Sequence, residues 1–321
     1  MSIYSITHRE DLDGLGSAAL LVHYYNMDTR NILFIDYSKD VFESTIQKLG
    51  KIKTKGSVFI FTDFSLNESF IKPLSNALKK ISKNNTCIWL DHHQWSNEAI
   101  KTMASYCKLM IVGENTENCA TELVYKILCK NSRVGDRLAE LAHASDFALD
   151  TKDDNLLRDI AFSIKYANRF SKNPEADLRK LVKIIAKGDF NNPIFKELSE
   201  KYDKESKKLM KSLIESSIVI KNKKASIALG FSKRLQSTDA CITLMKKHNT
   251  SIGMFCDVED GSVHLRSKKN VDCSVIAKAM DGGGHPQACG FEVEIKDFGG
   301  FNKAGREKFA ELMQELLDKN F

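Results

Sequence analysis

The sequence predicts an α/β protein in which a doubly wound, mostly parallel sheet domain is joined by a long helix to a smaller α/β domain, with the functional site in the cleft between them. Short apolar runs alternate with amphipathic segments in the first half of the chain, which is typical of parallel sheets with helices on both faces. Residues 195–219 are rich in lysine and glutamate at helical spacing, and the pattern of apolar runs changes after residue 222. We therefore expect domains at 1–190 and 223–321, joined by a helical linker at 191–222.

The composition is that of an ordinary globular protein. The chain has 321 residues, 42% hydrophobic and 28% charged, which is enough for two cores. Its formal charge of +6 suits anionic ligands but does not by itself indicate nucleic-acid binding. The eight cysteines form no C-x-x-C pair, so we interpret them as reduced thiols of an intracellular protein. The start of the chain leaves no room for a signal peptide, and no apolar run reaches the roughly 20 residues of a membrane span. We therefore expect a cytoplasmic protein.

Each element is predicted from its own periodicity. In the first domain, bounded apolar runs predict strands at residues 3–7, 32–37, 57–63, 86–90 and 108–112. Helical spacing there predicts helices over residues 18–22, 41–49, 74–81, 119–129, 137–149 and 156–166. The second domain is expected to contain strands at 225–229, 250–257, 261–267 and 291–295, and helices at 238–246, 275–280 and 303–317.

The first polar cluster follows the first predicted strand and has the spacing H-x-x-D-x-D-G, with His8, Asp11 and Asp13. We interpret it as a strand-to-helix turn in which Gly14 and Gly16 allow a tight turn and the free N–H groups of the helix face a phosphate. Helix capping would account for one aspartate. A histidine and two aspartates within six positions exceed that need and predict a cation site.

Further acids and imidazoles end neighbouring strands. Asp91, His92 and His93 follow the strand at 86–90, and Asp63 closes an earlier strand, although Asp63 alone would also serve as a helix cap. The carboxyl ends of parallel strands share one edge of a sheet, so these side chains should converge. Carboxylates mixed with imidazole suit Mn²⁺, Mg²⁺ or Zn²⁺. Asp146 lies among small apolar residues of a predicted helix, where a buried acid needs a partner, so it is another candidate ligand.

The second domain contains two more candidate motifs. In the alternating strand at 261–267, His264 and Arg266 lie on one face. The run from Gly282 to Gly284, followed by His285, allows backbone amides to approach an anion, and His285 can donate to a phosphate or a base. A flexible turn is the alternative interpretation.

Taken together, these residues resemble the DHH phosphoesterase family, which is named for the triplet found here at Asp91, His92 and His93. The resemblance covers nearly the whole chain in five ordered motifs, which also include the H-x-x-D-x-D-G run, Asp63, Asp146, and a Leu-Arg-Ser run followed by Gly-Gly-Gly-His. Many members have three residues between the first His and the first Asp, where this chain has two.

The resemblance implies a site with two divalent cations, Mn²⁺ foremost, with Mg²⁺ or Co²⁺ as alternatives. The metal ligands that it implies are His8, Asp11 and Asp63 for one ion, and Asp13, Asp63, His92 and Asp146 for the other. His93 would lie near the scissile phosphate and Asp91 would orient the site. The implied substrate-binding residues are His93, His264, Arg266, Gly283, Gly284 and His285, with His93, Asp91, Arg266 and His285 as the catalytic set.

The implied activity is hydrolysis of phosphodiester or phosphomonoester bonds of short nucleotides, as in oligoribonucleases that also act on 3′-phosphoadenosine 5′-phosphate. A phosphodiesterase for cyclic di-AMP or linear dinucleotides and a single-strand exonuclease are the alternatives. An inorganic pyrophosphatase shares the metal motifs, but its Ser-Arg-Lys-Lys run is matched only faintly by residues 266–269. A processive exonuclease would need a basic, aromatic-lined channel, and a nucleotide sensor would have lost a ligand. The expected partners are a short oligonucleotide or dinucleotide and, in a homodimer, a second copy of the chain.

Overall fold

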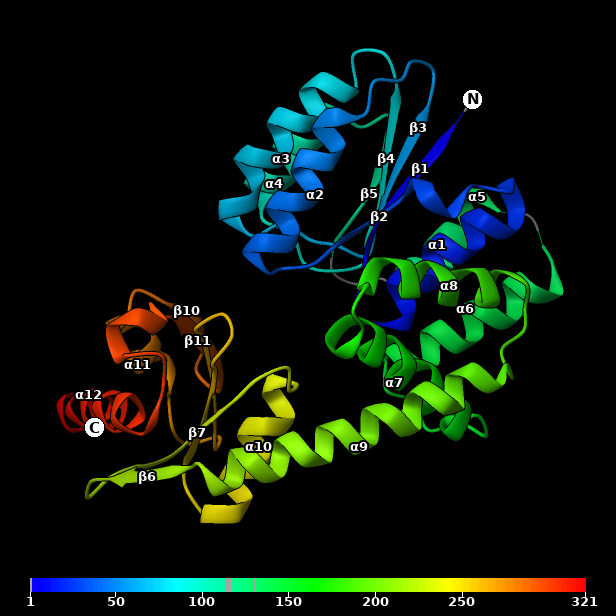
Figure 1. Ribbon diagram of the computed structural model, residues 1–321. Helices are drawn as coiled ribbons and strands as arrows, with labels where there is room; N and C mark the ends of the chain where they lie inside the picture. Colours follow the sequence, from blue (N-terminus) through cyan, green and yellow to red (C-terminus); the bar gives the residue numbers. More distant parts are fainter. Residues whose placement is uncertain (1, 114–116, 130) are drawn as a thin grey trace. The chain divides into compact units, whose positions relative to one another are not determined.

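The computed structural model describes residues 2–113, 117–129 and 131–321. The chain divides into two compact units, Met1–Tyr202 and Asp203–Phe321 (Figure 1). Among the helices of the described ranges, none combines the length and the apolarity that a membrane crossing requires.

The first unit is built on a five-stranded parallel sheet with the order β2-β1-β3-β4-β5. Its strands are β1 (Ile3–His8), β2 (Ile32–Ile35), β3 (Val58–Thr62), β4 (Thr86–Leu90) and β5 (Leu109–Ile111). All five strands occur where the apolar runs predict them, and β4 has the predicted bounds. The parallel α/β fold class of this unit is confirmed.

Helices cover both faces of this sheet (Figure 1), because successive strand residues point to opposite sides. Along β3, Phe59 and Phe61 pack into one core and Ile60 into another. The first face is covered by α2 (Lys39–Lys51), α3 (Glu68–Ile81) and α4 (Asn97–Ala104). The helices of the other face are α1 (Leu12–Tyr25), α5 (Ala120–Leu128), α6 (Arg133–Asp146), α7 (Asp154–Phe170) and α8 (Pro174–Ala186).

The start of α1 differs from the prediction. The helix begins at Leu12, and Asp11 caps it by accepting the N–H of Gly14 at 3.0 Å. Gly14 and Gly16 therefore lie inside the helix and not in a tight turn. A Cβ on Gly14 would lie 2.2 Å from the carbonyl oxygen of His8, and one on Gly16 would lie 2.8 Å from Oγ1 of Thr121. These glycines allow α1 to pack closely against β1 and α5.

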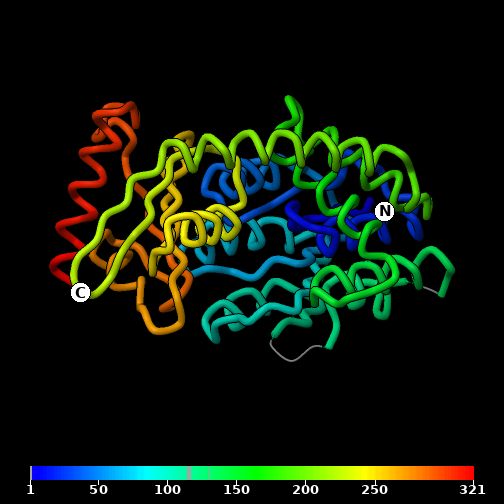
Figure 2. The backbone as a smooth tube through the Cα atoms, turned by 90° about the horizontal axis from the view of Figure 1, so that it is seen from below, coloured from blue at the N-terminus to red at the C-terminus, as the bar shows by residue number. Residues whose placement is uncertain are grey.

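The predicted long helix is present as α9 (Pro193–Glu215), and the boundary between the two units falls within it, after Tyr202 (Figure 2). Its exposed face carries ion pairs one turn apart, such as Glu197 with Lys201 and Asp203 with Lys207, which stabilise a solvated helix by a few tenths of a kcal/mol each. The prediction extends this helix too far, because strand β6 (Ile218–Lys221) begins three residues after it ends.

The second unit has a six-stranded mixed sheet with the order β10-β11-β9-β8-β7-β6. Besides β6, its strands are β7 (Ser226–Ser232), β8 (Ile252–Asp257), β9 (Ser262–Ser267), β10 (Gly283–His285) and β11 (Ala288–Glu292). Its helices are α10 (Ser237–His248), α11 (Ser274–Ala279) and α12 (Lys303–Asn320). The glycine run expected as a loop forms the edge strand β10, which pairs with β11.

Candidate metal centre

The candidate ligands of the first unit converge at the carboxyl edge of its parallel sheet. His8 is the last residue of β1, Asp63 follows β3, and Asp91 to His93 follow β4. Because β1, β3 and β4 are adjacent strands, their ends bring these side chains together. Asp13 joins them from the first turn of α1, and Asp146 is the last residue of α6.

Asp63 lies at the middle of the cluster and is only 2% exposed. Its Oδ2 lies 3.6 Å from Nδ1 of His8, whereas its Oδ1 lies 3.7 Å from Nε2 of His92 and 3.8 Å from Nδ1 of His93. Its backbone adopts a left-handed conformation with φ of 55°, which is uncommon for a residue other than glycine and costs free energy. The strand-end turn thus directs the two carboxylate oxygens of one residue toward two different groups of side chains.

The first group consists of His8, Asp11 and Asp63, whose ligand atoms lie within 4.8 Å of one another. Nδ1 of His8 lies 3.2 Å from Oδ2 of Asp11. The other oxygen of Asp11 accepts the N–H of Gly14. The capping role of Asp11 therefore fixes its free oxygen beside His8, even with the short spacing between these two residues.

The second group consists of Asp13, His92 and Asp146. Nε2 of His92 lies 3.7 Å from Asp13 and 3.6 Å from Asp146. The Asp13 carboxylate accepts the backbone N–H groups of Ala120 and Thr121, each at 2.7 Å. These amides begin α5, where the helix dipole favours negative charge. The side chain of Asp146 is 23% exposed, so it is less buried than its apolar helix face predicts, because α6 ends there.

His93 lies close enough to Asp63 and His92 to form a third possible ligand group, and it is also paired with Asp91. Asp91 is fully buried, and its two oxygens accept the indole N–H of Trp95 at 2.6 Å and interact with Nδ1 of His93 at 2.8 Å. If Nδ1 of His93 carries the proton for this bond, its Nε2 is left as the acceptor. Asp91 therefore orients His93 and does not itself face the two ligand groups.

The electrostatics of the cluster favour a cation. Burial, and next the carboxylates of Asp11 and Asp13, raise the pKa of Asp63 well above its usual value. Burial alone would lower the pKa of His8, but Asp11 and Asp63 hold that pKa well above its usual value. So many buried carboxylates cannot all ionise without compensating charge. The clustered groups must retain protons or bind cations.

Two buried atoms support the second option. Oδ2 of Asp63 and Nε2 of His92 have no hydrogen-bond partner within the described part of the chain. Buried polar atoms are nearly always paired, and an exception calls for an explanation such as an ion. Both atoms point into the ligand groups, and hard oxygen donors mixed with imidazole nitrogen suit Mn²⁺ and related divalent ions. The residues present therefore fit a pair of divalent cations.

Some positions show the strand-end signal without belonging to the cluster. Asp36 follows β2 and is buried, but its Oδ2 lies 2.7 Å from Nε of Arg9, so its charge is already neutralised. Glu122 acts as a helix cap: it accepts the N–H of Cys119 at 3.0 Å and also interacts with His143. No sequence pattern marks Trp95 as a functional residue, although it follows Asp91 by only four residues and donates its indole N–H to that carboxylate.

The remaining candidate residues lie in the second unit. Along one line across its sheet, His285 of β10 pairs with Ala288 of β11, which in turn pairs with Arg266 of β9. Nη2 of Arg266 donates to Oγ1 of Thr238 at 3.0 Å. His264 pairs with Gly290 two positions away on the same strands. The structure thus brings the two predicted motifs of this unit onto three neighbouring strands.

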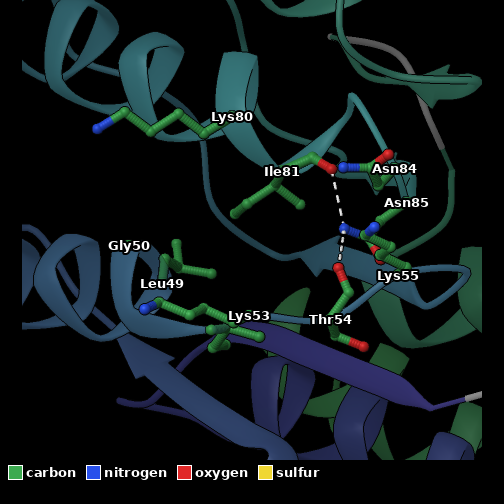
Figure 3. Close-up of a pocket in the computed structure, with 10 residues that line it drawn as sticks. Leu49, Gly50, Lys53, Thr54, Lys55, Lys80, Ile81, Asn84 and Asn85 are labelled. Atoms are coloured by element: carbon green, nitrogen blue, oxygen red, sulfur yellow. Dashed lines mark hydrogen bonds between the residues drawn. The ribbon is translucent and has the colours of Figure 1, made fainter.

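The hollow shown in Figure 3 is a different feature. It holds about 490 Å³ at the amino ends of β3 and β4, the edge of the sheet opposite the ligand groups. Lys53, Lys55, Lys80, Asn84 and Asn85 contribute to its wall, and among the described residues that line it none has a carboxylate or an imidazole. It is therefore not the metal centre.

Comparison with known families identifies both parts of the chain. Residues 2–146 match the N-terminal domain of the DHH family, and residues 219–317 match the DHHA1 domain. The first match contains every candidate ligand, and the second contains the Arg266 and Gly-Gly-Gly-His motifs. A comparison with curated proteins gave no match.

Several solved structures share the fold. A pGpG-specific phosphodiesterase, PggH from Vibrio cholerae, is 15% identical, with 99% of this chain and 100% of that chain covered and a TM-score of 0.54. The DHH domain of a member of a family of ribosomal proteins is 15% identical, with coverages of 98% and 86% and a TM-score of 0.62. RecJ from Thermus thermophilus, solved with Mn²⁺, is 13% identical, with coverages of 97% and 52% and a TM-score of 0.57. At these identities the likeness concerns the fold.

Proposed function

The chain belongs to the DHH family of phosphoesterases, and from this premise we propose that it is a hydrolase that cleaves phosphoester bonds of short nucleotides with two divalent cations, Mn²⁺ foremost. The observation that carries the proposal is Asp63, whose two oxygens face two separate ligand groups. A carboxylate so placed can bridge a pair of ions. When bound, such a pair lowers the pKa of a water molecule and stabilises the attacking and leaving oxygens of the displacement.

The ligands divide between the two groups. His8 and Asp11 would hold one ion, and Asp13, His92 and Asp146 the other, with Asp63 shared by both. The amides of α5 hold the Asp13 carboxylate in place, and a fixed ligand loses little freedom when it binds a metal.

His93 is proposed to contact the scissile phosphate. Burial alone would lower its pKa, but the hydrogen bond between its Nδ1 and Asp91 raises it overall, which favours the protonated form that can donate to phosphate. Its side chain is 40% exposed, which leaves it open to a ligand. Asp91 is a positioning residue, because its contacts are with His93 and Trp95.

Arg266 and His285 are proposed to bind the far end of the substrate. They lie across one intervening strand in the second unit, together with Gly283 and Gly284 on the exposed edge strand β10. His264 lies two residues before Arg266 on β9. A guanidinium, an imidazole and free edge amides are groups that bind phosphate oxygens.

Short nucleotides are the proposed substrates, including small oligoribonucleotides and 3′-phosphoadenosine 5′-phosphate. The fold shared with a pGpG-specific phosphodiesterase supports a dinucleotide-sized ligand, whereas the fold shared with RecJ leaves a single-strand exonuclease as the second candidate. Cyclic di-AMP is a third substrate to test. The homodimer and the cytoplasmic location stay predictions from the sequence.

One experiment separates these activities. The purified chain is incubated with Mn²⁺ and, in parallel, with a dinucleotide, 3′-phosphoadenosine 5′-phosphate, cyclic di-AMP, a strand of about 20 nucleotides and pyrophosphate. We expect hydrolysis of the short substrates, little action on the long strand or pyrophosphate, and no activity after exhaustive chelation. Turnover that survives chelation would refute the two-cation mechanism, and cleavage of pyrophosphate alone would refute the nucleotide substrate.

A further inference from the structure

We propose that Tyr37 and Phe147 are two base-stacking platforms on the two sides of Asp63, so that the site binds a linear dinucleoside phosphate with one base against each ring. This inference rests on the proposed function and names its substrate class. It follows from which aromatic side chains are exposed, from what they contact, and from how they are held.

Tyr37 lies beside the first ligand group. It follows β2 by two residues, and its side chain is 39% exposed. Its ring lies 5.8 Å from that of His8 and stacks on Phe64 at 4.8 Å. Phe64 covers one face of the ring, and the residue as a whole keeps 39% of its surface exposed. The Tyr37 hydroxyl interacts with Oγ of Ser65 at 3.1 Å and accepts the N–H of Ser65 at 3.3 Å.

Phe147 lies beside the second ligand group. It directly follows Asp146 and is 40% exposed. Its ring lies 6.3 Å from that of His92 and 4.6 Å from that of His143. His143 is itself held by Glu122, with 2.7 Å between Nδ1 and Oε2. An aromatic ring packed against fixed neighbours loses little freedom when a base stacks on it, which favours binding.

Single exposed apolar residues are common on protein surfaces and need no explanation. The position of these two is what distinguishes them. Among the described residues, three aromatic side chains are exposed, and they are Tyr25, Tyr37 and Phe147. Tyr37 contacts His8, which lies beside Oδ2 of Asp63. Phe147 contacts His92, which lies beside Oδ1 of Asp63. Tyr25 has no ring contact with a histidine among the described side chains, and it provides a natural comparison.

A linear dinucleotide has the matching arrangement of groups. It carries one bridging phosphate between two bases, and the cations beside Asp63 are where that phosphate would be held. Each base would then extend past His8 or His92 toward an exposed ring. Since every base has an aromatic face, stacking of this kind tolerates different sequences. The structure therefore predicts a site selective for dinucleotide length with weak base preference.

The test compares Tyr37→Ala and Phe147→Ala with Tyr25→Ala, which removes the third exposed aromatic side chain, and with Tyr37→Phe, which keeps the ring. The substrates are a dinucleotide and two abasic analogues, each lacking one base. We expect each alanine variant to raise KM for the dinucleotide by about 5- to 150-fold, the loss of one stacked base, with little change in kcat. Each variant should then leave one of the two abasic analogues unaffected. Tyr25→Ala should behave as the wild type, and Tyr37→Phe should restore most of the affinity that Tyr37→Ala loses.

Calorimetric binding of a phosphorothioate dinucleotide keeps this inference separate from the proposed function, because it requires no turnover. Alanine variants that bind and hydrolyse the dinucleotide like the wild type would overturn the platforms and leave the phosphoesterase proposal standing. Equal losses on the dinucleotide and on both abasic analogues would also overturn them, because that result indicates a structural effect. A wild type that binds the dinucleotide but cleaves no phosphoester would refute the proposed function alone.

Discussion

Replacing Asp63 with asparagine tests the shared carboxylate directly. Asparagine has nearly the same shape and tolerates the left-handed backbone that this residue adopts, with φ of 55°, so the local fold should persist. The substitution removes the negative charge that both ligand groups share. We therefore expect Asp63→Asn to lose metal binding and to keep its fold.

The size of the effect follows from binding linkage. At a free Mn²⁺ concentration of about 100 times Kd, the ion stabilises the folded state by about 2.7 kcal/mol. For the first unit, Met1–Tyr202, each kcal/mol raises the unfolding temperature by roughly 2–4 °C. The wild type should thus gain roughly 5–11 °C with Mn²⁺, and Asp63→Asn less than about 2 °C.

In the metal-free state we expect Asp63→Asn to have the opposite effect on the unfolding temperature. Burial and neighbouring carboxylates raise the pKa of Asp63 well above its usual value, which means that its ionised form destabilises the fold at neutral pH. A neutral amide removes that cost, so metal-free Asp63→Asn should unfold at or above the temperature of metal-free wild type.

Differential scanning fluorimetry in EDTA and across a Mn²⁺ titration measures both effects, and calorimetry gives the number of ions bound. Asp150→Asn, which changes an exposed carboxylate, is the matched control and should keep the full metal response. An Asp63→Asn protein that shows the wild-type Mn²⁺ response would refute the bridging role. A metal-free variant several degrees less stable than the wild type would refute the electrostatic reasoning.

Three further outcomes are expected. In EDTA, the unfolding temperature should fall as the pH rises from about 5 to 8, because the fold raises the pKa of Asp13, Asp63 and His8, and the folded state therefore binds more protons than the unfolded state. A thermal scan showing greater stability at the higher pH would contradict this. Trp95→Phe keeps an aromatic ring beside Trp89, whose ring lies 4.9 Å from that of Trp95, but removes the N–H donated to buried Asp91. We expect kcat to fall by roughly 10- to 100-fold, by analogy with lost outer-shell partners of metal sites, with KM nearly unchanged; steady-state kinetics with unaltered kcat would exclude a positioning role for Trp95. Arg266→Ala should raise KM for dinucleotides, whereas Arg266→Lys, which keeps the charge but not the fork that reaches Thr238, should recover part of the affinity; an unchanged rate on dinucleotides for the alanine variant would remove Arg266 from the binding site.

Periodicity predicted most of the elements whose residues are apolar on a regular repeat. The run from Thr86 to Leu90 is bounded by polar residues, and β4 has those bounds. The edge strand β10 was missed because glycines have no side-chain pattern to read, although its partner β11 follows closely along the chain. Helix α8 (Pro174–Ala186) was missed although its buried residues follow a helical repeat. The start of α1 was placed too late because glycine was taken as a turn signal, whereas Gly14 is required by the close approach of His8.

Residue type and spacing predicted the candidate ligands, and the structure brings His8, Asp63 and His92 together as expected from strand ends. Spacing could not show which oxygen of Asp63 faces which group, because that depends on its left-handed backbone. Nor could it show that two amides of α5 hold Asp13, since those groups are more than one hundred residues apart.

By itself, the sequence determined the chemistry available to this protein: acids and imidazoles placed where strands end, in a chain whose apolar periodicity specifies a parallel sheet. Only the tertiary structure decided how these side chains are used. It separated Asp91, bound to Trp95, from the candidate metal ligands, and it placed Tyr37 and Phe147 beside His8 and His92. The physical reason is that strand-end positions follow from local periodicity, whereas the orientation of each donor atom depends on packing between segments far apart in the chain.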